Sequence, residues 1–312
     1  MMNSQISLIK FPELAKIVEY IFSNSPLQKK RISKYFAGQT SPEFWQFSED
    51  LSAILNTHFM PDPIGKEKAA NAYNKMCKDF LSEQIKFKRT GKYSCIDSAV
   101  ANSAVYGDPK VMRYYMIGLL LSYIFWPNHY ELFRFFKHSI PRHNINNYLE
   151  VGVGHGLFTS TILQKFPLAL PTIVDISATS IETAKEILQC FSIRSTEFNF
   201  IHNDFLKTEF AHEFEFIIMG EVLEHVNDAS LFMKKTKSLL ASKGSVYLST
   251  CANSSALDHV YHFHNVDEIR ALILSSGFQI VKDLALPAED IPQVNWEREL
   301  VTINYCALLE HQ

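Results

Sequence analysis

Residues 148–158 read YLEVGVGHGLF, and this stretch decides the fold of the chain. An apolar run ends in three glycines at alternate positions, Gly152, Gly154 and Gly156, and a helix-like run over residues 157–166 follows at once. This order predicts a strand, a tight turn and a helix. Glycine has no Cβ and tolerates positive φ, so the turn lets a ligand lie directly on the backbone at the N-terminus of the helix.

The glycine spacing and an acidic neighbour narrow the kind of ligand. The dinucleotide fingerprint G-x-G-x-x-G would place its third glycine at position 157, where this chain has Leu157. Glu150 stands two residues before the first glycine, where it would repel a pyrophosphate but suits a ligand that carries an ammonium or sulfonium charge. S-adenosylmethionine is such a ligand.

The segment resembles the first motif of class I S-adenosylmethionine-dependent methyltransferases, and the resemblance extends over residues 147–309. Later motifs follow in the order of that family. The sequence PTIVD ends a second strand at Asp175, and a third strand, residues 198–201, runs into the tripeptide NDF. A fourth strand, residues 214–219, opens into GEVLEHV, as in bacterial small-molecule methyltransferases of the ubiquinone-biosynthesis type. The resemblance therefore implies S-adenosylmethionine as the cofactor.

The same resemblance implies a role for each motif. An acidic residue at the end of the second strand, here Asp175, contacts the ribose hydroxyls, a device that dinucleotide enzymes share. Asp204 would meet the adenine amino group with Phe205 packed nearby, and Glu221 would lie near the methionine end of the cofactor. The predicted cofactor-binding residues are therefore Glu150, Gly152, Gly154, Gly156, Asp175, Asp204, Phe205 and Glu221.

The C-terminal half alternates strands and helices in the order that a parallel sheet requires. We predict an α/β fold, with a Rossmann-like seven-stranded methyltransferase sheet and helices on both of its faces. The resemblance places the last strand, residues 301–309, antiparallel between the fifth and sixth strands. Thr179 and Glu182 form a candidate capping box in this half, and Asp228 is a candidate N-cap for the helix that stops before Gly244.

Residues 1–140 are predicted to form a mostly helical domain ahead of the sheet. Apolar residues recur there at helical intervals, for example over residues 14–22. Asp108, followed by proline, favours the start of a helix that Pro127 ends. Because the glycine motif follows directly, these helices can reach over the crevice at the strand ends. We assign them a lid and acceptor-pocket role, with homodimer formation as a further candidate role, and residues 141–312 form the domain that binds S-adenosylmethionine.

Composition limits the class of protein. The net charge is −3 with no long basic run, so we expect no nucleic-acid partner. The five cysteines are odd in number and widely spaced, which is typical of reduced thiols in a cytoplasmic protein. The N-terminus lacks the residue order of a signal peptide. The most apolar stretch, residues 111–126, contains Arg113 and is too short to cross a bilayer, so we predict a buried helix and no membrane partner.

The chemistry is expected where the fourth and fifth strands end. Methyl transfer is an in-line displacement, so the protein must align the acceptor, exclude water and, for a hydroxyl acceptor, remove a proton. His225 is the leading candidate for that general base. If the segment is helical, Glu221, Glu224 and His225 share one face, because they lie at i, i+3 and i+4. Three interpretations compete for this trio: a base beside a cofactor contact, metal ligands as in methyltransferases that modify RNA 3′ ends, or helix capping alone.

The segment LDHVYHFH follows the fifth strand and adds further histidines. A loop at a strand end can touch the acceptor, so His259 and His262 are the other catalytic candidates. A metal on the preceding trio would take its additional ligand from His259, His262 or His264. We interpret the aromatic cluster WPNHY, residues 126–130, as core packing.

These observations predict an enzyme that transfers a methyl group from S-adenosylmethionine to a small organic acceptor. Oxygen is favoured as the methylated atom, and specialised metabolite biosynthesis as the setting. One alternative is a metal-dependent methyltransferase that acts on RNA or protein. The other is a non-catalytic cofactor-binding module that regulates a partner enzyme, for which the acceptor crevice would be plugged by the chain's own side chains.

Overall fold

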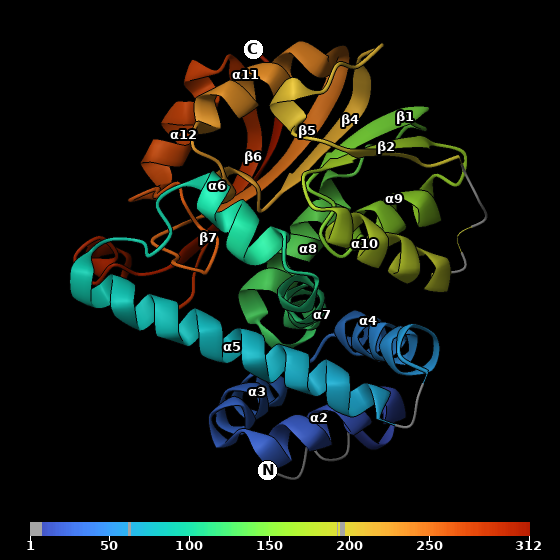
Figure 1. The fold of residues 1–312 in the computed structure, drawn as a ribbon, viewed down its shortest axis with the longest axis vertical. Coiled ribbons are helices and arrows are strands. Elements are labelled where there is room, and N and C mark those ends of the chain that lie inside the picture. The colour runs from blue at the N-terminus through green and yellow to red at the C-terminus, as the bar shows by residue number, and fades with distance from the viewer. Residues whose placement is uncertain (1–7, 62–63, 192, 194–196) are drawn as a thin grey trace.

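The computed structural model describes residues 8–61, 64–191, 193 and 197–312. Across these residues seven strands form one sheet in the order β3-β2-β1-β4-β5-β7-β6 (Figure 1). Strands β1 to β5 pair parallel, whereas β7 pairs antiparallel with both β5 and β6. The predicted fold class and the antiparallel insertion of the last strand are confirmed. The strands are β1 (Asn147–Val151), β2 (Leu170–Asp175), β3 (Asn199–His202), β4 (Phe214–Gly220), β5 (Leu240–Ala252), β6 (Phe278–Pro287) and β7 (Ile303–His311).

Alternate side chains of β1 enter hydrophobic cores on opposite faces of the sheet. Tyr148 belongs to the core that α9 and α10 share with the N-terminal helices, and Leu149 belongs to the core beneath α11 and α12. Helices therefore cover both faces, as predicted (Figure 1). These helices are α9 (Leu157–Lys165), α10 (Ala178–Cys190), α11 (Ala229–Leu239) and α12 (Val266–Ser275), with short 3-10 turns η3 (Phe205–Lys207), η4 (Leu223–His225) and η5 (Gln293–Asn295).

The N-terminal region is helical, as predicted. Three of its helices begin with proline after a residue whose side chain accepts a hydrogen bond from the first turn, namely Ser25, Ser41 and Asp108. Among the described helices, none is long and apolar enough to cross a membrane. The elements are α2 (Pro12–Asn24), α3 (Pro26–Gly38), α4 (Pro42–Ala53), the π-helix η1 (Ile54–Phe59), α5 (Gly65–Thr90), α6 (Ser98–Ala101), the π-helix η2 (Asn102–Tyr106), α7 (Pro109–Phe125) and α8 (Pro127–Ser139).

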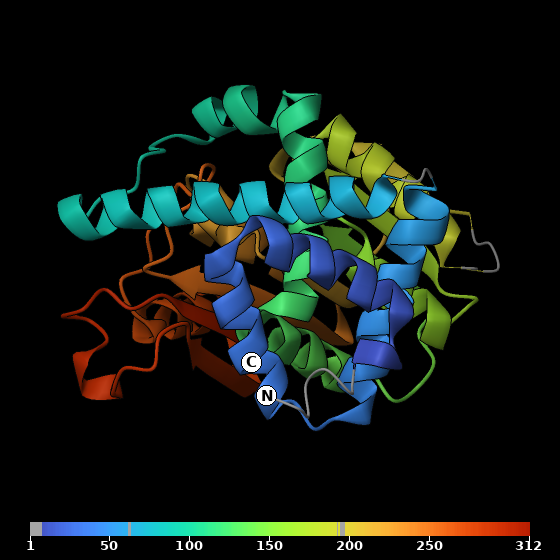
Figure 2. The same ribbon diagram turned by 90° about the horizontal axis from the view of Figure 1, so that it is seen from below.

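The helical region is packed against the sheet chiefly through α8, which contacts β5, β6 and β7. Most residues of α7 are buried, and its apolar side chains join a core that continues from α2 to the sheet. Helix α5 packs along α7 and spans nearly the width of the molecule (Figure 2). Gln84 of α5 donates to the carbonyl oxygen of Asn253 at 3.2 Å and accepts from the N–H of Ser255 at 3.1 Å. The helices are therefore hydrogen-bonded directly to the loop that follows β5.

The predicted capping box at Thr179 and Glu182 is wrong. The N-cap of α10 is Ser177, whose hydroxyl accepts from the N–H of Ser180 at 3.2 Å. The cause lies in the preceding strand, because Asp175 accepts from the N–H of Ser177 and holds that residue in an extended conformation. The helix therefore begins two residues earlier than the capping-box pattern indicated. The N-cap predicted at Asp228 is confirmed by its bond from the N–H of Leu231 at 3.0 Å.

Candidate active site

A cavity of about 1400 Å³ lies at the carboxyl ends of β1, β2, β4 and β5. Its other walls come from the helical region, chiefly from α3, α5, α7 and the start of α8. This volume exceeds the roughly 300–1,000 Å³ that is usual for a ligand pocket, so it offers room for two molecules side by side. The cavity is open, so it does not provide the support that a crevice plugged by the chain's own side chains would have given the regulatory-module alternative.

The three glycines of the first motif have different structural roles. All three have positive φ, at 74° for Gly152, 51° for Gly154 and 75° for Gly156. Gly154 lines the cavity, and a Cβ added there would find only the sulfur of Met116 within 4 Å, at 3.7 Å. A Cβ on Gly156 would instead meet Ala184 of α10 at 3.4 Å. Gly154 therefore presents bare backbone to the cavity, whereas a Cβ on Gly152 would meet Val222 at 3.0 Å and Gly156 permits close helix packing.

Two acidic residues and a phenylalanine extend this end of the cavity. Asp175 accepts from the N–H of Val153 at 2.9 Å and from that of Ser177 at 2.7 Å, and burial raises its pKa to about 6. Asp204 accepts from the N–H of Leu206 at 2.9 Å and caps η3. Phe205 is buried, and all three predicted residues line the same cavity as Gly154. Backbone hydrogen bonds within the turns thus fix both carboxylates.

Glu150 does not lie in the cavity wall. It shares a strand face with Tyr148, and its carboxyl accepts a short hydrogen bond from the hydroxyl of Thr159 on α9. Complete burial raises the pKa of Glu150 to about 8, so the group is mostly neutral at pH 7. This placement does not fit the charge pairing that the sequence suggested, and it makes Glu150 a link between strand and helix.

The GEVLEHV segment is not a continuous helix, so the condition under which its three polar residues would share one helical face is not met. Glu221 has a left-handed conformation with φ 54°, and only residues 223–225 form a 3-10 turn. The N–H of Glu221 donates to the carbonyl oxygen of Ser249 at 3.0 Å, which anchors the turn to β5. Such strain in a non-glycine residue is common at functional sites.

Glu221 and Glu224 nevertheless meet at the cavity. One carboxyl oxygen of each is buried without a hydrogen-bond partner among the described residues. The other oxygen of Glu224 accepts from the hydroxyl of Thr250 at 2.8 Å. Burial, and then the charge of Glu221, raise the pKa of Glu224 well above its usual value. Burial also raises the pKa of Glu221, so this buried pair of carboxyl groups favours protonation.

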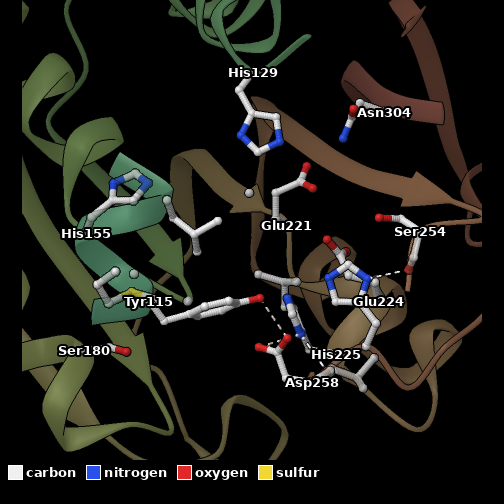
Figure 3. Close-up of a pocket in the computed structure, with 18 of the residues that line it drawn as sticks. Tyr115, His129, His155, Ser180, Glu221, Glu224, His225, Ser254, Asp258 and Asn304 are labelled. Atoms are coloured by element: carbon white, nitrogen blue, oxygen red, sulfur yellow. Dashed lines mark hydrogen bonds and ion pairs between the residues drawn. The ribbon is translucent and has the colours of Figure 1, made fainter. Parts of the chain in front are cut away.

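His225 lines the cavity, and its tautomer follows from its partners. The Nδ1 atom lies 3.1 Å from the main-chain oxygen of Asp258 and 3.4 Å from the Oδ2 of the same residue. A main-chain carbonyl oxygen can only accept, so Nδ1 carries the hydrogen and Nε2 is left with a free lone pair. Figure 3 shows His225 beside Asp258, with Glu224 close by.

His259 also lines the cavity, whereas His262 does not. His259 donates from Nδ1 to the main-chain oxygen of Ser254 at 2.7 Å, and burial lowers its pKa to about 4. Its ring lies 4.8 Å from that of His225. His262 instead bonds Asn253 through Nε2 at 2.9 Å and packs against Tyr93. Of the three predicted catalytic histidines, the structure brings only His225 and His259 together.

Two groups among the described residues could hold a metal ion. Glu224, His225 and His259 offer ligand atoms that all lie within 4.8 Å of one another, and so do Glu221, Glu224 and Cys251. His262 and His264, which we considered as additional ligands, join neither group. The group that most resembles the metal alternative considered from the sequence therefore consists of Glu224, His225 and His259, without Glu221.

Sequence reasoning missed several residues of the cavity wall. Trp126 and His129, which we interpreted as core packing, line the cavity, and so do Tyr115 and His155. The Nδ1 of His129 lies 2.7 Å from the hydroxyl of Ser122, and burial lowers the pKa of His129 to about 4. One sequence feature indicated this part of the cavity. It is the proline break between α7 and α8, which exposes the first turn of α8.

A family model for the methyltransferase domain matches residues 120–282. The chain belongs to this family. It therefore carries a methyltransferase domain, and the predicted family and its cofactor, S-adenosylmethionine, are confirmed at this level.

Two curated relatives are similar over part of their length. The chain is 32% identical over 109 residues to malonyl-[acyl-carrier protein] O-methyltransferase 1 of Ilyobacter polytropus. The aligned residues make up 35% of this chain and 39% of the relative. The chain is 29% identical over 107 residues to malonyl-[acyl-carrier protein] O-methyltransferase of Priestia megaterium. The aligned residues make up 34% of this chain and 37% of the relative. The match thus spans about two fifths of the relatives.

Solved structures are similar at lower identity. The N-methyltransferase NodS from Bradyrhizobium japonicum WM9, in complex with S-adenosyl-L-homocysteine, has a TM-score of 0.49 and 14% identity, with 65% of this chain and 97% of that chain covered. The StiE O-MT structure, residues 961–1257, has a TM-score of 0.46 and 12% identity, with 69% of this chain and 80% of that chain covered.

The residues at the glycine end of the cavity fit the cofactor of this family. Gly154 offers main chain without a Cβ and with space beside it, so a ligand can approach closely. Asp175 and Asp204 supply carboxylates that are already oriented by backbone bonds and can accept from hydroxyl and amino groups. Phe205 adds an apolar surface between them and β4.

Proposed function

We propose that this enzyme methylates an oxygen atom of a small organic acceptor in specialised metabolite biosynthesis, with His225 as the general base. One observation carries the proposal: the free Nε2 of His225 shares a cavity with the bare backbone of Gly154. The two curated relatives are named as O-methyltransferases, which supports oxygen as the methylated atom.

We assign the cavity two ends. Gly152, Gly154, Asp175, Asp204 and Phe205 would hold the cofactor, with Glu221 next to its methionine end. The backbone hydrogen bonds that fix Asp175 and Asp204 come from residues outside the helical region. The acceptor would occupy the space towards α5 and α7, which agrees with residues 1–140 as a lid and acceptor-pocket domain over residues 141–312. Aromatic side chains of that wall, Phe80, Tyr115 and Trp126, suit an apolar or aromatic acceptor.

When bound, S-adenosylmethionine supplies an electrophilic methyl group. The chain's own contribution is to align the acceptor hydroxyl and to accept its proton on the Nε2 of His225. The resulting imidazolium would donate from Nδ1 to Asp258, whose carboxyl is buried next to it. His259 is neutral at pH 7, since burial lowers its pKa to about 4, so no second cation faces His225 as it becomes charged.

Turnover with a panel of acceptors tests the proposal. The enzyme would be incubated with methyl-labelled S-adenosylmethionine and matched compounds that carry a hydroxyl, carboxyl, amine or thiol on the same apolar ring. We expect label to transfer to oxygen, with mass spectrometry of the product as the measurement. Label found only on nitrogen, sulfur or carbon would reject the oxygen assignment while leaving the family unaffected.

Metal-dependent methyl transfer is a second candidate, which the convergence of Glu224, His225 and His259 favours. Carboxylate and imidazole ligands suit divalent ions such as Zn²⁺ or Mn²⁺. In this scheme His225 would bind the ion through Nε2 and would not act as the base. Treatment with a chelator separates the two schemes, because loss of turnover that Zn²⁺ or Mn²⁺ restores supports the metal, whereas unchanged turnover supports the free base.

A further inference from the structure

Asp258 is held by two tyrosines from the helical region. The phenol of Tyr115 donates to Oδ1 at 3.0 Å, and the phenol of Tyr106 donates to Oδ2 at 3.0 Å. Asp258 is only 1% exposed, so water does not replace these donors. Figure 3 shows Tyr115 pointing at Asp258 from one side while His225 approaches from the other. Both carboxyl oxygens are therefore occupied by hydroxyl groups.

These bonds join parts of the chain that are far apart in sequence. Tyr115 lies on α7 and Tyr106 ends the π-helix η2, whereas His225 and Asp258 follow β4 and β5. The separations along the chain are 143 residues for the bond from Tyr115 and 152 for that from Tyr106. The carboxyl group that orients His225 thus reaches its geometry only through contacts with the other half of the chain.

Hydrogen bonds from neutral hydroxyls to a carboxylate are among the stronger ones in proteins, and they fix its plane. Burial raises the pKa of both Tyr106 and Tyr115, so each keeps its proton and remains a donor. With its plane fixed, Asp258 offers Oδ2 and its main-chain oxygen to the same nitrogen of His225. The fixed carboxylate thus reinforces the tautomer with hydrogen on Nδ1, which the main-chain oxygen of Asp258 also favours.

We propose that Tyr106 and Tyr115 are positioning residues, which act through Asp258 to hold His225 in one tautomer, so that the base is complete only while the helical region is seated on the sheet. The inference rests on the proposed role of His225. Neither tyrosine needs to touch the acceptor for this effect.

The segment that carries Tyr106 also reaches the cofactor end of the cavity. The main-chain oxygen of Tyr106 accepts from the hydroxyl of Ser177 at 3.3 Å, and the N–H of Ser98 donates to the side chain of Asn227 at 3.0 Å. Residues 98–106 therefore bridge the ends of β2, β4 and β5 across the cavity. A displacement of this segment that opened the cofactor end would also remove the donor from Oδ2 of Asp258.

Nitrogen NMR of the histidine rings tests the inference without any acceptor. The full-length protein, saturated with S-adenosylhomocysteine, would be compared with Tyr106→Phe, Tyr115→Phe and the double variant, with His225 assigned by its loss in His225→Gln. We expect wild-type His225 to show one protonated and one unprotonated nitrogen. The double variant should show two averaged resonances, as in a tautomer mixture, and each single variant an intermediate shift.

Tyr114→Phe is a matched control on the same helix. Its phenol also donates to a carboxylate, Asp79, at 2.8 Å, but this pair lies outside the cavity wall. The control should leave the His225 resonances unchanged. Identical His225 resonances in wild type and double variant would overturn the inference, and if the double variant fails to bind S-adenosylhomocysteine, the two single variants decide the question in the same way.

The outcome is separable from the test of the proposed function. Once an acceptor is known, the double variant should lower kcat roughly tenfold and leave KM within about twofold, because a misoriented base affects the transition state. If the tautomer shifts but His225→Ala keeps full turnover, the positioning network stands and the base assignment fails. If the tautomer does not shift, the positioning network fails whatever His225 does.

Discussion

The two ends of the cavity are built by different kinds of contact. At the glycine end Asp175 is fixed by backbone N–H groups of residues 153 and 177, which lie 22 and 2 positions away. At the histidine end Asp258 is fixed by Tyr106 and Tyr115, which lie 152 and 143 positions away. The glycine end should therefore persist when the helical region moves, whereas the histidine end should not. Substitutions at each end can test this division.

The largest effect is expected at His225. Removal of a general base usually costs roughly 10²- to 10⁴-fold in rate, so His225→Ala should lower kcat by that amount. The affinity for S-adenosylhomocysteine should stay within about twofold, because the glycine end does not depend on this ring. His143→Ala, at an exposed position remote from the cavity wall, is the control. Equal losses of turnover and cofactor affinity would contradict the separation of the two ends.

A smaller effect, confined to the other end, is expected at Gly154. Valine there would place side-chain atoms where the ligand approaches, and φ of 51° is unfavourable for a β-branched residue. We expect Gly154→Val to weaken binding of S-adenosylhomocysteine by roughly 100-fold or more, measured by calorimetry. Gly91→Val is the matched control, since Gly91 also has a positive φ, at 67°, its Cβ would meet nothing within 4 Å, and it lies outside the cavity wall. Normal affinity in Gly154→Val would show that the cofactor does not lie on this turn.

The same division explains which features of the cavity could be predicted from the sequence. The glycine turn and the acidic residues at 175 and 204 follow from short motifs, because turn geometry and strand ends are local properties, whereas the insertion of the last strand was implied by the family resemblance. The roles of Glu150 and Gly156 could not be seen in this way. Strand alternation and helix packing direct them towards α9 and α10 and away from the cavity.

At the histidine end the motif gave the residue types but not the geometry. Glu221, Glu224 and His225 would share one face only if the segment were helical, and the left-handed conformation of Glu221 prevents that. His262 and His259 were both candidates from the sequence, but only His259 lines the cavity. Nothing near Tyr106 or Tyr115 in the sequence indicates that they meet Asp258, because that pairing depends on how α7 docks.

The smallest effect concerns Glu150, whose role we expect to be structural. Its pKa is about 8 when folded and near 4.5 in an unfolded chain, so the folded state binds more protons between these values. The stability that this group contributes is therefore complete below about pH 4.5 and is lost as the pH rises through about 8. Glu150→Gln cannot ionise, and it should reduce the decline in stability over this range.

Thermal unfolding without cofactor is the measurement. We expect the Tm difference between Glu150→Gln and wild type to shift in favour of the variant by a few degrees from pH 5 to pH 8.5. Glu310→Gln, at a partly buried position on β7, should show no such trend. If Glu150 were instead a charged cofactor ligand, as its place in the motif suggested, the variant would lose affinity for S-adenosylmethionine and keep the wild-type pH dependence. The two outcomes show whether Glu150 links β1 to α9 or binds the cofactor, and therefore whether Glu150 belongs to the cofactor end of the cavity.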